Sequence, residues 1–294
     1  MSNIQNNNLI LINALNEYLR TMPDQIDPKT LEEVKASGVR ELYAYASLLN
    51  SYMGLDEMFI DRYLLNMLIK DDVDKYLNNP FYLKMDNLEQ AASGKLKLDY
   101  SFIEQYELFA QDEIDTAIDG RIYPQIAYFD DFLKCVTIYD HERILSRFNP
   151  LVVNACIVPL DEVKGKIACF GLGNGYFAYM AHLKDNVSAL TIYEANNDLI
   201  ELFKKGMLPK FDYPEKIKIV KADPYLFLKN KTNKLSVDYA FINCWSDYKT
   251  GVKDYHRFKK LEANRPRVKY MYYLENSILA YPKEEDNENN WLLA

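Results

Sequence analysis

The second half of the chain alternates short apolar runs with helical segments, and this alternation constrains the fold more than any other feature. Each run is continuous and rich in β-branched or aromatic residues, as in buried parallel strands. Strands and helices at this spacing predict a Rossmann-like α/β domain over residues 165–294, with a doubly wound parallel sheet and right-handed crossovers. The predicted strands are KIACF (166–170), SALTIYE (188–194), KIKIV (216–220), VDYAFIN (237–243) and VKYMYYL (268–274).

The first 120 residues show helical periodicity instead. Residues 9–19 carry an apolar stripe at helical spacing. Asp27 and Pro28 supply a cap and a first helical residue, and Gly38 ends that helix. We therefore expect an all-helical domain over residues 1–120. Further helical segments are predicted at 39–53, 55–70 and 99–119, the last one stopping at Gly120.

The segment from residue 121 to 164 has a different character. Two short apolar and aromatic runs within 122–139 surround the polar pair Asp130-Asp131, which predicts a β-hairpin. Asn149-Pro150 then predicts the cap and first turn of a helix that runs to about residue 159. We expect this hairpin and helix to connect the helical domain to the Rossmann-like domain.

The charge distribution argues against a nucleic-acid partner. Residues 1–120 hold 10 Lys and Arg against 21 Asp and Glu, and the rest hold 25 against 22, within totals of 35 and 43. Nowhere do basic residues interleave with aromatic residues in a stripe that could bind phosphates. The acidic first half is typical of solvated helix faces.

The remaining composition is that of a cytoplasmic protein with no membrane span and no metal. No run approaches the ~18 to 20 apolar residues that cross a bilayer. The N-terminal stretch has neither a basic n-region nor a small-residue cleavage site, and we interpret it as the first helix. The four cysteines are widely spaced, which indicates reduced thiols, and the three histidines lack metal-ligand spacing. A homodimer is left open.

A glycine-rich turn follows the first predicted strand directly. Gly171, Gly173 and Gly175 would permit a tight turn and a close approach of a ligand to the backbone. The amide groups at the start of the next helix would favour an anionic group. The alternative is a tight strand-to-helix turn that binds no ligand.

Two acidic residues end the next two predicted strands. Glu194 lies 23 residues after Gly171 and can accept hydrogen bonds from both ribose hydroxyls, or else it is an exposed cap for a helix beginning at Asn196. Asp223 ends the third strand and could equally be an N-cap, with Pro224 as the first helical residue. With the glycine turn, these residues fall at the carboxyl ends of three successive strands, where such sheets bind ligands.

These features resemble a class I S-adenosylmethionine-dependent methyltransferase over about 110 residues, from Gly165 to Leu274. The stretch from Gly171 to Phe203 is also similar to a group of uncharacterised bacterial methyltransferase-like proteins. The resemblance implies that the glycine turn lies against the methionine and ribose parts of the cofactor. It implies that Glu194 holds the ribose hydroxyls and that Asp223 faces the adenine amine. Spermidine synthases share this arrangement.

The sequence departs from the family's pattern in several places. Cys169 occupies the position of an acidic residue that usually precedes the first glycine, so a methionine amino group would need another acceptor. The family's last two strands are missing, which makes this a shortened class I methyltransferase fold. Asp247 is the only carboxylate in the loop 243–248 after the fourth strand, and it is our candidate for the catalytic base. Tyr176 stands where a dinucleotide site requires its third glycine, which disfavours NAD.

Three functions are carried forward. The first is S-adenosylmethionine-dependent methyl transfer to an unknown acceptor, either a small molecule or a protein. The second is aminopropyl transfer to a polyamine, as in spermidine synthases. The third is a non-catalytic protein that binds S-adenosylmethionine or interacts with a partner through its helical half. In an enzyme, that half would cover the carboxyl edge of the sheet and shape the acceptor pocket.

Overall fold

A computed structural model describes residues 3–21 and 25–280. The acidic, Asn-rich tail lies outside the described residues. The α-helices are α1 (Asn3–Thr21), α2 (Pro28–Ala36), α3 (Glu41–Tyr52), α4 (Leu65–Met67), α5 (Asp74–Leu77), α6 (Pro80–Met85), α7 (Pro150–Glu162), α8 (Tyr176–His182), α9 (Asn197–Leu202), α10 (Pro224–Lys229), α11 (Tyr248–Lys259) and α12 (Glu275–Ala280). Two π-helical turns, η1 (Ile60–Leu64) and η2 (Phe203–Met207), and three 3₁₀ turns, η3 (Leu208–Lys210), η4 (Pro214–Lys216) and η5 (Glu262–Asn264), complete the helical elements.

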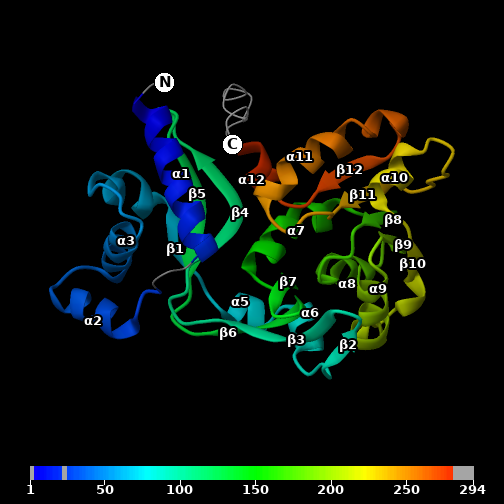
Figure 1. Cartoon of the computed structure of the whole chain (residues 1–294), viewed down its shortest axis with the longest axis horizontal. Helices are drawn as coiled ribbons and strands as arrows, with labels where there is room; N and C mark the ends of the chain where they lie inside the picture. Colours follow the sequence, from blue (N-terminus) through cyan, green and yellow to red (C-terminus); the bar gives the residue numbers. More distant parts are fainter. Residues whose placement is uncertain (1–2, 22–24, 281–294) are drawn as a thin grey trace.

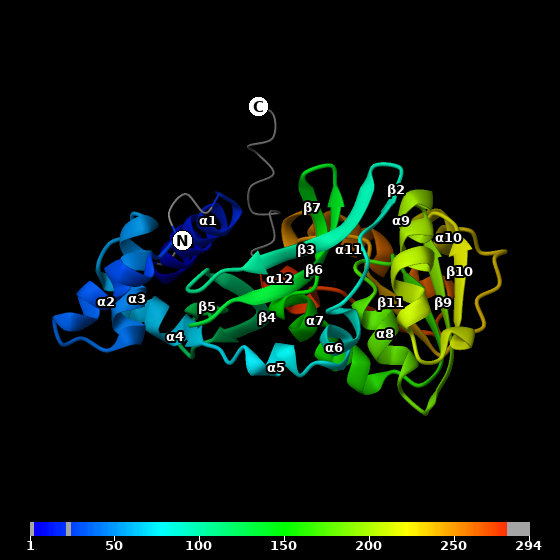
Figure 2. The same cartoon turned by 90° about the horizontal axis from the view of Figure 1, so that it is seen from below.

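The strands form three sheets in the described part of the chain. The strands are β1 (Leu68–Lys70), β2 (Ala91–Ser93), β3 (Leu96–Ile103), β4 (Phe109–Thr116), β5 (Ile122–Tyr128), β6 (Leu133–Asp140), β7 (Arg143–Arg147), β8 (Gly165–Phe170), β9 (Val187–Glu194), β10 (Ile217–Lys221), β11 (Tyr239–Ile242) and β12 (Lys269–Tyr272). Figures 1 and 2 show α1–α3 at one end of the molecule, the five-stranded sheet at the other, and β3–β7 between them.

The five-stranded sheet is parallel throughout and has the order β10-β9-β8-β11-β12. Its strands are the five that the apolar runs predict, so the Rossmann-like parallel sheet is confirmed. Numbered from the first of them, the order is 3-2-1-4-5, as in the first five strands of doubly wound nucleotide-binding sheets. The central strands β8 and β11 are almost fully buried at their carboxyl ends, which explains their continuous apolar sequences.

The all-helical interpretation of residues 1–120 is wrong, because β1 to β4 all lie within this range. The predicted helix at 99–119 is instead the end of β3, a turn and β4. Tyr106, between the two strands, has a φ of 62°, which breaks any continuous helix. β3 pairs with β6 along its whole length, and such pairing outweighs a local helical pattern.

The predicted hairpin at 122–139 is also wrong, although both of its strands exist. β5 lies between β1 and β4, whereas β6 lies between β3 and β7 in another sheet. The reason is burial: β5 is buried along nearly its whole length, so it needs a neighbour on each side and a cover on each face. The chain therefore passes from one sheet to the next at Phe129, which is fully buried.

Two predicted helix starts are confirmed in atomic detail. The side chain of Asp27 accepts a hydrogen bond from the Thr30 amide, 2.9 Å away, at the start of α2. The side chain of Asn149 accepts one from the Val152 amide, 3.0 Å away, at the start of α7. Both helices have proline in the first turn, where its missing amide hydrogen costs nothing.

Two hydrophobic cores hold the molecule together. The first contains residues of α1–α4 and of β1 and β5. The second joins the five-stranded sheet to α6, α7, β3 and β6. The segments before residue 150 are thus divided between both cores, and β2–β7 pack as much with the parallel sheet as with the N-terminal helices.

Direct polar contacts also tie the early strands to the parallel sheet. Asp112 on β4 is buried, and its Oδ1 accepts hydrogen bonds from the Ser277 amide at 2.8 Å and from the Ser277 hydroxyl at 2.5 Å. Burial raises the pKa of Asp112. Gly206, after α9, has no room for a side chain because Leu98 of β3 fills that space. The elements that follow β9 and β12 are therefore contacted by β3 and β4, not by the N-terminal helices.

Among residues 3–21 and 25–280, the structure contains no helix with both the length and the apolarity of a transmembrane segment.

His182 should make the stability of the protein depend on pH. The ring is fully buried, its Nε2 accepts a hydrogen bond from the Asp212 amide at 3.1 Å, and its Nδ1 contacts the Tyr179 carbonyl. Burial lowers the pKa of His182 against the opposing effect of the Asp212 carboxylate, with Lys216 and Lys84 nearby lowering it further.

A lowered pKa means that the unfolded chain binds this proton before the folded chain does. The free energy of unfolding should therefore fall as pH drops through about 6.5, by roughly 1.4 kcal/mol for each unit by which the pKa is lowered. Urea unfolding between pH 7.5 and 5.5 measures this slope, and it should be shallower in His182→Gln. Identical slopes in both proteins would contradict the buried neutral ring.

Candidate cofactor site

The candidate site lies where the order of the parallel strands reverses. β8 and β11 are neighbours in the sheet, but the chain leaves β8 toward β9 on one side and leaves β11 toward β12 on the other. The connections diverge at this point, so a crevice opens at the carboxyl ends of the two strands. The glycine turn follows β8 and the loop 243–247 follows β11, which brings two segments 70 residues apart in sequence to one place.

The glycine turn requires its glycines. Gly171, Gly173 and Gly175 have φ values of 90°, 57° and 81°, which side chains rarely adopt. A Cβ on Gly171 would come within 2.0 Å of the Asn243 carbonyl, and one on Gly173 within 2.5 Å of the Asn243 Nδ2. The turn is thus packed directly against the carboxyl end of β11.

Glu194 is part of the framework of the site. It is 9% exposed, its Oε2 accepts from the Leu172 amide at 2.9 Å, and its Oε1 accepts from the Asn196 amide at 2.8 Å. The alternative of an exposed helix cap is wrong, because the side chain of Asn196 caps α9. The carboxylate instead joins the glycine turn to the end of β9. Glu194→Ala would leave two backbone amides without acceptors, so it would cost stability as well as cofactor affinity.

Asp223 and Asp247 are both helix N-caps. The Asp223 Oδ1 accepts from the Leu226 amide at 2.7 Å at the start of α10, and this side chain is exposed. The Asp247 Oδ1 accepts from the Thr250 amide at 2.8 Å at the start of α11, while its Oδ2 contacts the Thr250 hydroxyl at 2.9 Å. Both carboxylates follow strands of the sheet at its carboxyl edge, and both have a capping role that explains their presence without a ligand.

Two asparagines of the site escape a reading of the sequence alone. Asn243 packs on Gly173, as described above. Asn174 is 4% exposed, its Oδ1 accepts from the Tyr176 amide at 3.1 Å, and its Nδ2 has no acceptor among the described residues. Both lie inside segments that the sequence singles out, but only the folded structure shows their contacts.

The thiols near the turn are protonated structural groups. Cys169 and Cys244 donate to the carbonyls of Gly171 and Phe170, each at 3.1 Å. Burial raises the pKa of both thiols, so neither is a thiolate nucleophile at neutral pH. Cys169 supplies no negative charge for a cofactor's amino group. No group of His, Cys, Asp or Glu in the described part of the chain could hold a metal ion.

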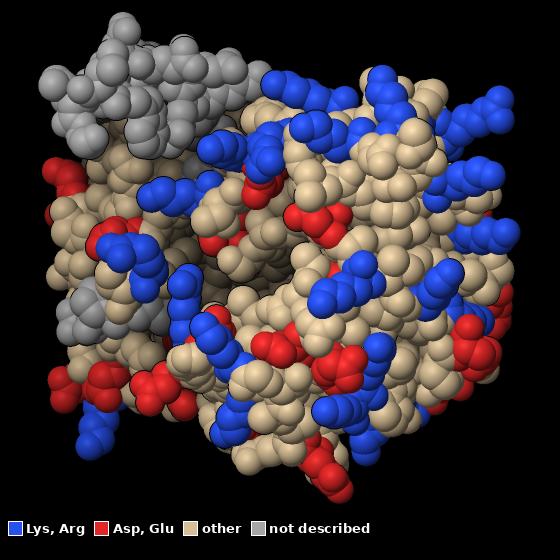
Figure 3. Space-filling model, turned by 45° about the vertical axis from the view of Figure 1, so that its right-hand side comes forward, with Lys and Arg blue, Asp and Glu red and all other residues tan. Residues whose placement is uncertain are grey.

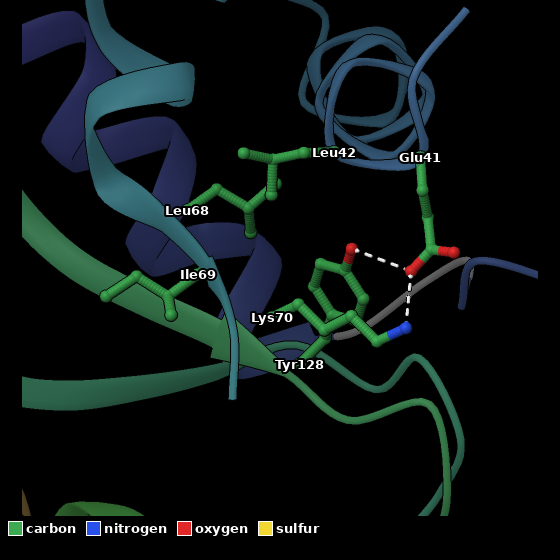
Figure 4. A pocket seen from close by; sticks show the side chains of 6 residues that line it. All are labelled: Glu41, Leu42, Leu68, Ile69, Lys70 and Tyr128. Atoms are coloured by element: carbon green, nitrogen blue, oxygen red, sulfur yellow. Dashed lines mark hydrogen bonds and ion pairs between the residues drawn. The ribbon is translucent and has the colours of Figure 1, made fainter. Parts of the chain in front are cut away.

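Two other concavities lie away from the predicted site residues. A pocket of about 460 Å³ is lined by residues of α3, β1 and β5, where Glu41 pairs with Lys70 at 3.0 Å and accepts from the Tyr128 hydroxyl (Figure 4). A groove of about 670 Å³ lies at the opposite, amino edge of the parallel sheet and includes Lys166 and Arg267. Figure 3 also shows a deep hollow near the middle of one face, with acidic and basic side chains around its rim.

No model of a known protein family and no curated protein matches this sequence. Among solved structures, the chain is similar to spermidine synthase from Thermotoga maritima, with 15% identity over 58% of this chain and 53% of that chain and a TM-score of 0.32. It is similar to a spermidine synthase in complex with the transition-state analogue AdoDATO (15% identity, 54% and 46%, TM-score 0.31). It is also similar to MNMC2 from Aquifex aeolicus (12% identity, 86% and 69%, TM-score 0.25). The matched part spans about half the length of the two spermidine synthases. These likenesses carry no argument here, and the fold assignment rests on the strand order.

The contact between Gly173 and Asn243 predicts how the turn responds to a side chain. Gly54 has a φ of 64° with nothing within 4 Å of a built Cβ, so Gly54→Ala pays only for the backbone conformation, about 1–2 kcal/mol. Gly173→Ala should cost at least ~1 kcal/mol more in urea unfolding, because its Cβ meets Asn243. In an Asn243→Ala background this excess should shrink. Equal losses for the two glycines would show that the turn is not packed against β11 as described.

Proposed function

We propose that this protein binds S-adenosylmethionine in the crevice between β8 and β11 and transfers its methyl group to a small-molecule or protein acceptor. The observation that supports this proposal best is the packing of the glycine turn, Glu194 and Asn243 at the point where the strand order reverses. Rossmann-like sheets bind nucleotide-type ligands at such a point. The unpartnered amide of Asn174 in the turn is a polar group that a ligand can satisfy.

The arrangement suggests a role for each residue of the cofactor side. The backbone of Gly171–Gly175 would lie against the methionine and ribose parts. Each oxygen of Glu194 accepts one backbone amide and keeps a further lone pair, so the carboxylate can also accept from ribose hydroxyls. Asp223 uses Oδ1 for its cap, which leaves Oδ2 for the adenine amine.

The same arrangement disfavours NAD. Tyr176, the first residue of α8, is 3% exposed, and its ring packs against those of Phe81 and Phe148 at centroid distances of 5.5 and 5.6 Å. A dinucleotide site has a glycine here so that the helix can pack closely on the strand.

Bound S-adenosylmethionine supplies an activated methyl group, and the chain's own residues would supply orientation and exclude water. Asp247 is our candidate for accepting a proton from the acceptor, because it follows β11 beside the crevice. Its hydrogen bonds with Thr250 would hold the carboxylate in place. Asparagine is also a good N-cap, so Asp247→Asn removes the charge without removing the cap of α11.

Calorimetric titration tests the cofactor assignment. S-adenosylhomocysteine should bind and NAD should not, and a ligand at ~100 times its Kd should stabilise the fold by about 2.7 kcal/mol. Glu194→Gln should weaken binding ~10-fold or more, because hydrogen bonds to a charged group are worth about 1.5–3 kcal/mol. Glu201→Gln is the matched control, since Glu201 only forms an exposed pair with Lys204. Absence of heat and of any thermal shift with millimolar S-adenosylhomocysteine would refute the proposal.

A further inference from the structure

The buried amide of Asn174 is a donor without an acceptor. Its Oδ1 accepts from the Tyr176 amide, and this bond fixes which end of the carboxamide is nitrogen. The Nδ2 therefore faces the other way, and it is buried with no partner among the described residues. Buried polar groups in folded proteins are normally paired, so an unpaired donor inside a candidate site indicates a group that the ligand supplies.

The neighbouring backbone has the same imbalance. The Gly171 amide donates to the Tyr193 carbonyl, the Leu172 amide to Glu194, and the Gly175 amide to the Leu172 carbonyl. The amides of Gly173 and Asn174 have no acceptor in the part of the chain that the structure describes. Three donors at two consecutive residues are thus left over.

Acceptors are scarce at the same turn. Cys169 donates its own S–H to the Gly171 carbonyl and carries no charge at neutral pH. Glu194 already accepts two backbone amides. A ligand group beside this turn is therefore matched by its donors, and a carboxylate, which only accepts, is the group that fits them.

We propose that Asn174 donates to the α-carboxylate of the cofactor's amino-acid tail and makes the site select S-adenosylmethionine over its decarboxylated form. This inference rests on the proposed function and sharpens it. The decarboxylated compound, which donates aminopropyl groups, ends in an ammonium group alone and offers these donors nothing to bind. The site would therefore favour methyl transfer over aminopropyl transfer.

Titration with three adenosyl compounds tests this selection. The wild-type protein should bind S-adenosylhomocysteine ~10-fold or more tightly than 5′-methylthioadenosine, which lacks the tail, because hydrogen bonds to charged groups are strong. Asn174→Asp keeps an oxygen for the Tyr176 amide but replaces the donor with an acceptor. It should lose this ~10-fold preference and bind decarboxylated S-adenosylmethionine better than S-adenosylhomocysteine.

Asn149→Asp is the matched control, because it adds the same charge and keeps the cap of α7. Its ratio of affinities should equal that of the wild type. Asn174→Ser, which keeps a hydroxyl oxygen, should also lose the preference, and it serves if the aspartate variant does not fold. Equal wild-type affinities for S-adenosylhomocysteine and 5′-methylthioadenosine would overturn this inference alone, as would an unchanged ratio in both Asn174 variants, which would assign the amide to a bound water. Failure of every adenosyl compound to bind would refute the proposed function itself.

Discussion

The hydrogen bond between the Leu172 amide and Glu194 is the interaction on which the candidate site depends. It joins the turn after β8 to the end of β9, and the second oxygen of Glu194 holds the Asn196 amide that leads into α9. A buried carboxylate that accepts two amides fixes both segments, because breaking either bond would leave a buried donor or a buried charge unpaired. The turn is therefore held in its left-handed conformation from one side by Glu194 and from the other by Asn243.

The rest of the molecule supports this arrangement from the outside. β3 and β6 share a core with the parallel sheet, and β4 holds α12 through the buried contact between Asp112 and Ser277. The N-terminal helices pack mainly on β1 and β5 in a separate core. An acceptor pocket shaped by the first half of the chain would thus be bordered by strands and by α12, rather than by the helices that the sequence indicates.

The sequence predicts the parallel sheet well and the first half of the chain poorly, for one physical reason. A strand buried on both faces needs a continuous apolar run, and KIACF and VDYAFIN show it directly. Residues 96–116 lie at a partly exposed surface, so their apolar spacing suits a helix and a strand equally, and long-range pairing with β6 decides the outcome. Similarly, Glu194 can be located from its position after a strand, but its two amide partners and the unpaired amide of Asn174 exist only after folding.

A crystal structure of the protein with S-adenosylhomocysteine tests the central claim most directly. If the crevice at the carboxyl ends of β8 and β11 is the cofactor site, the ribose will lie at Glu194 and the amino-acid tail beside Asn174. Ligand density in the groove at the amino edge, between Lys166 and Arg267, would contradict the account.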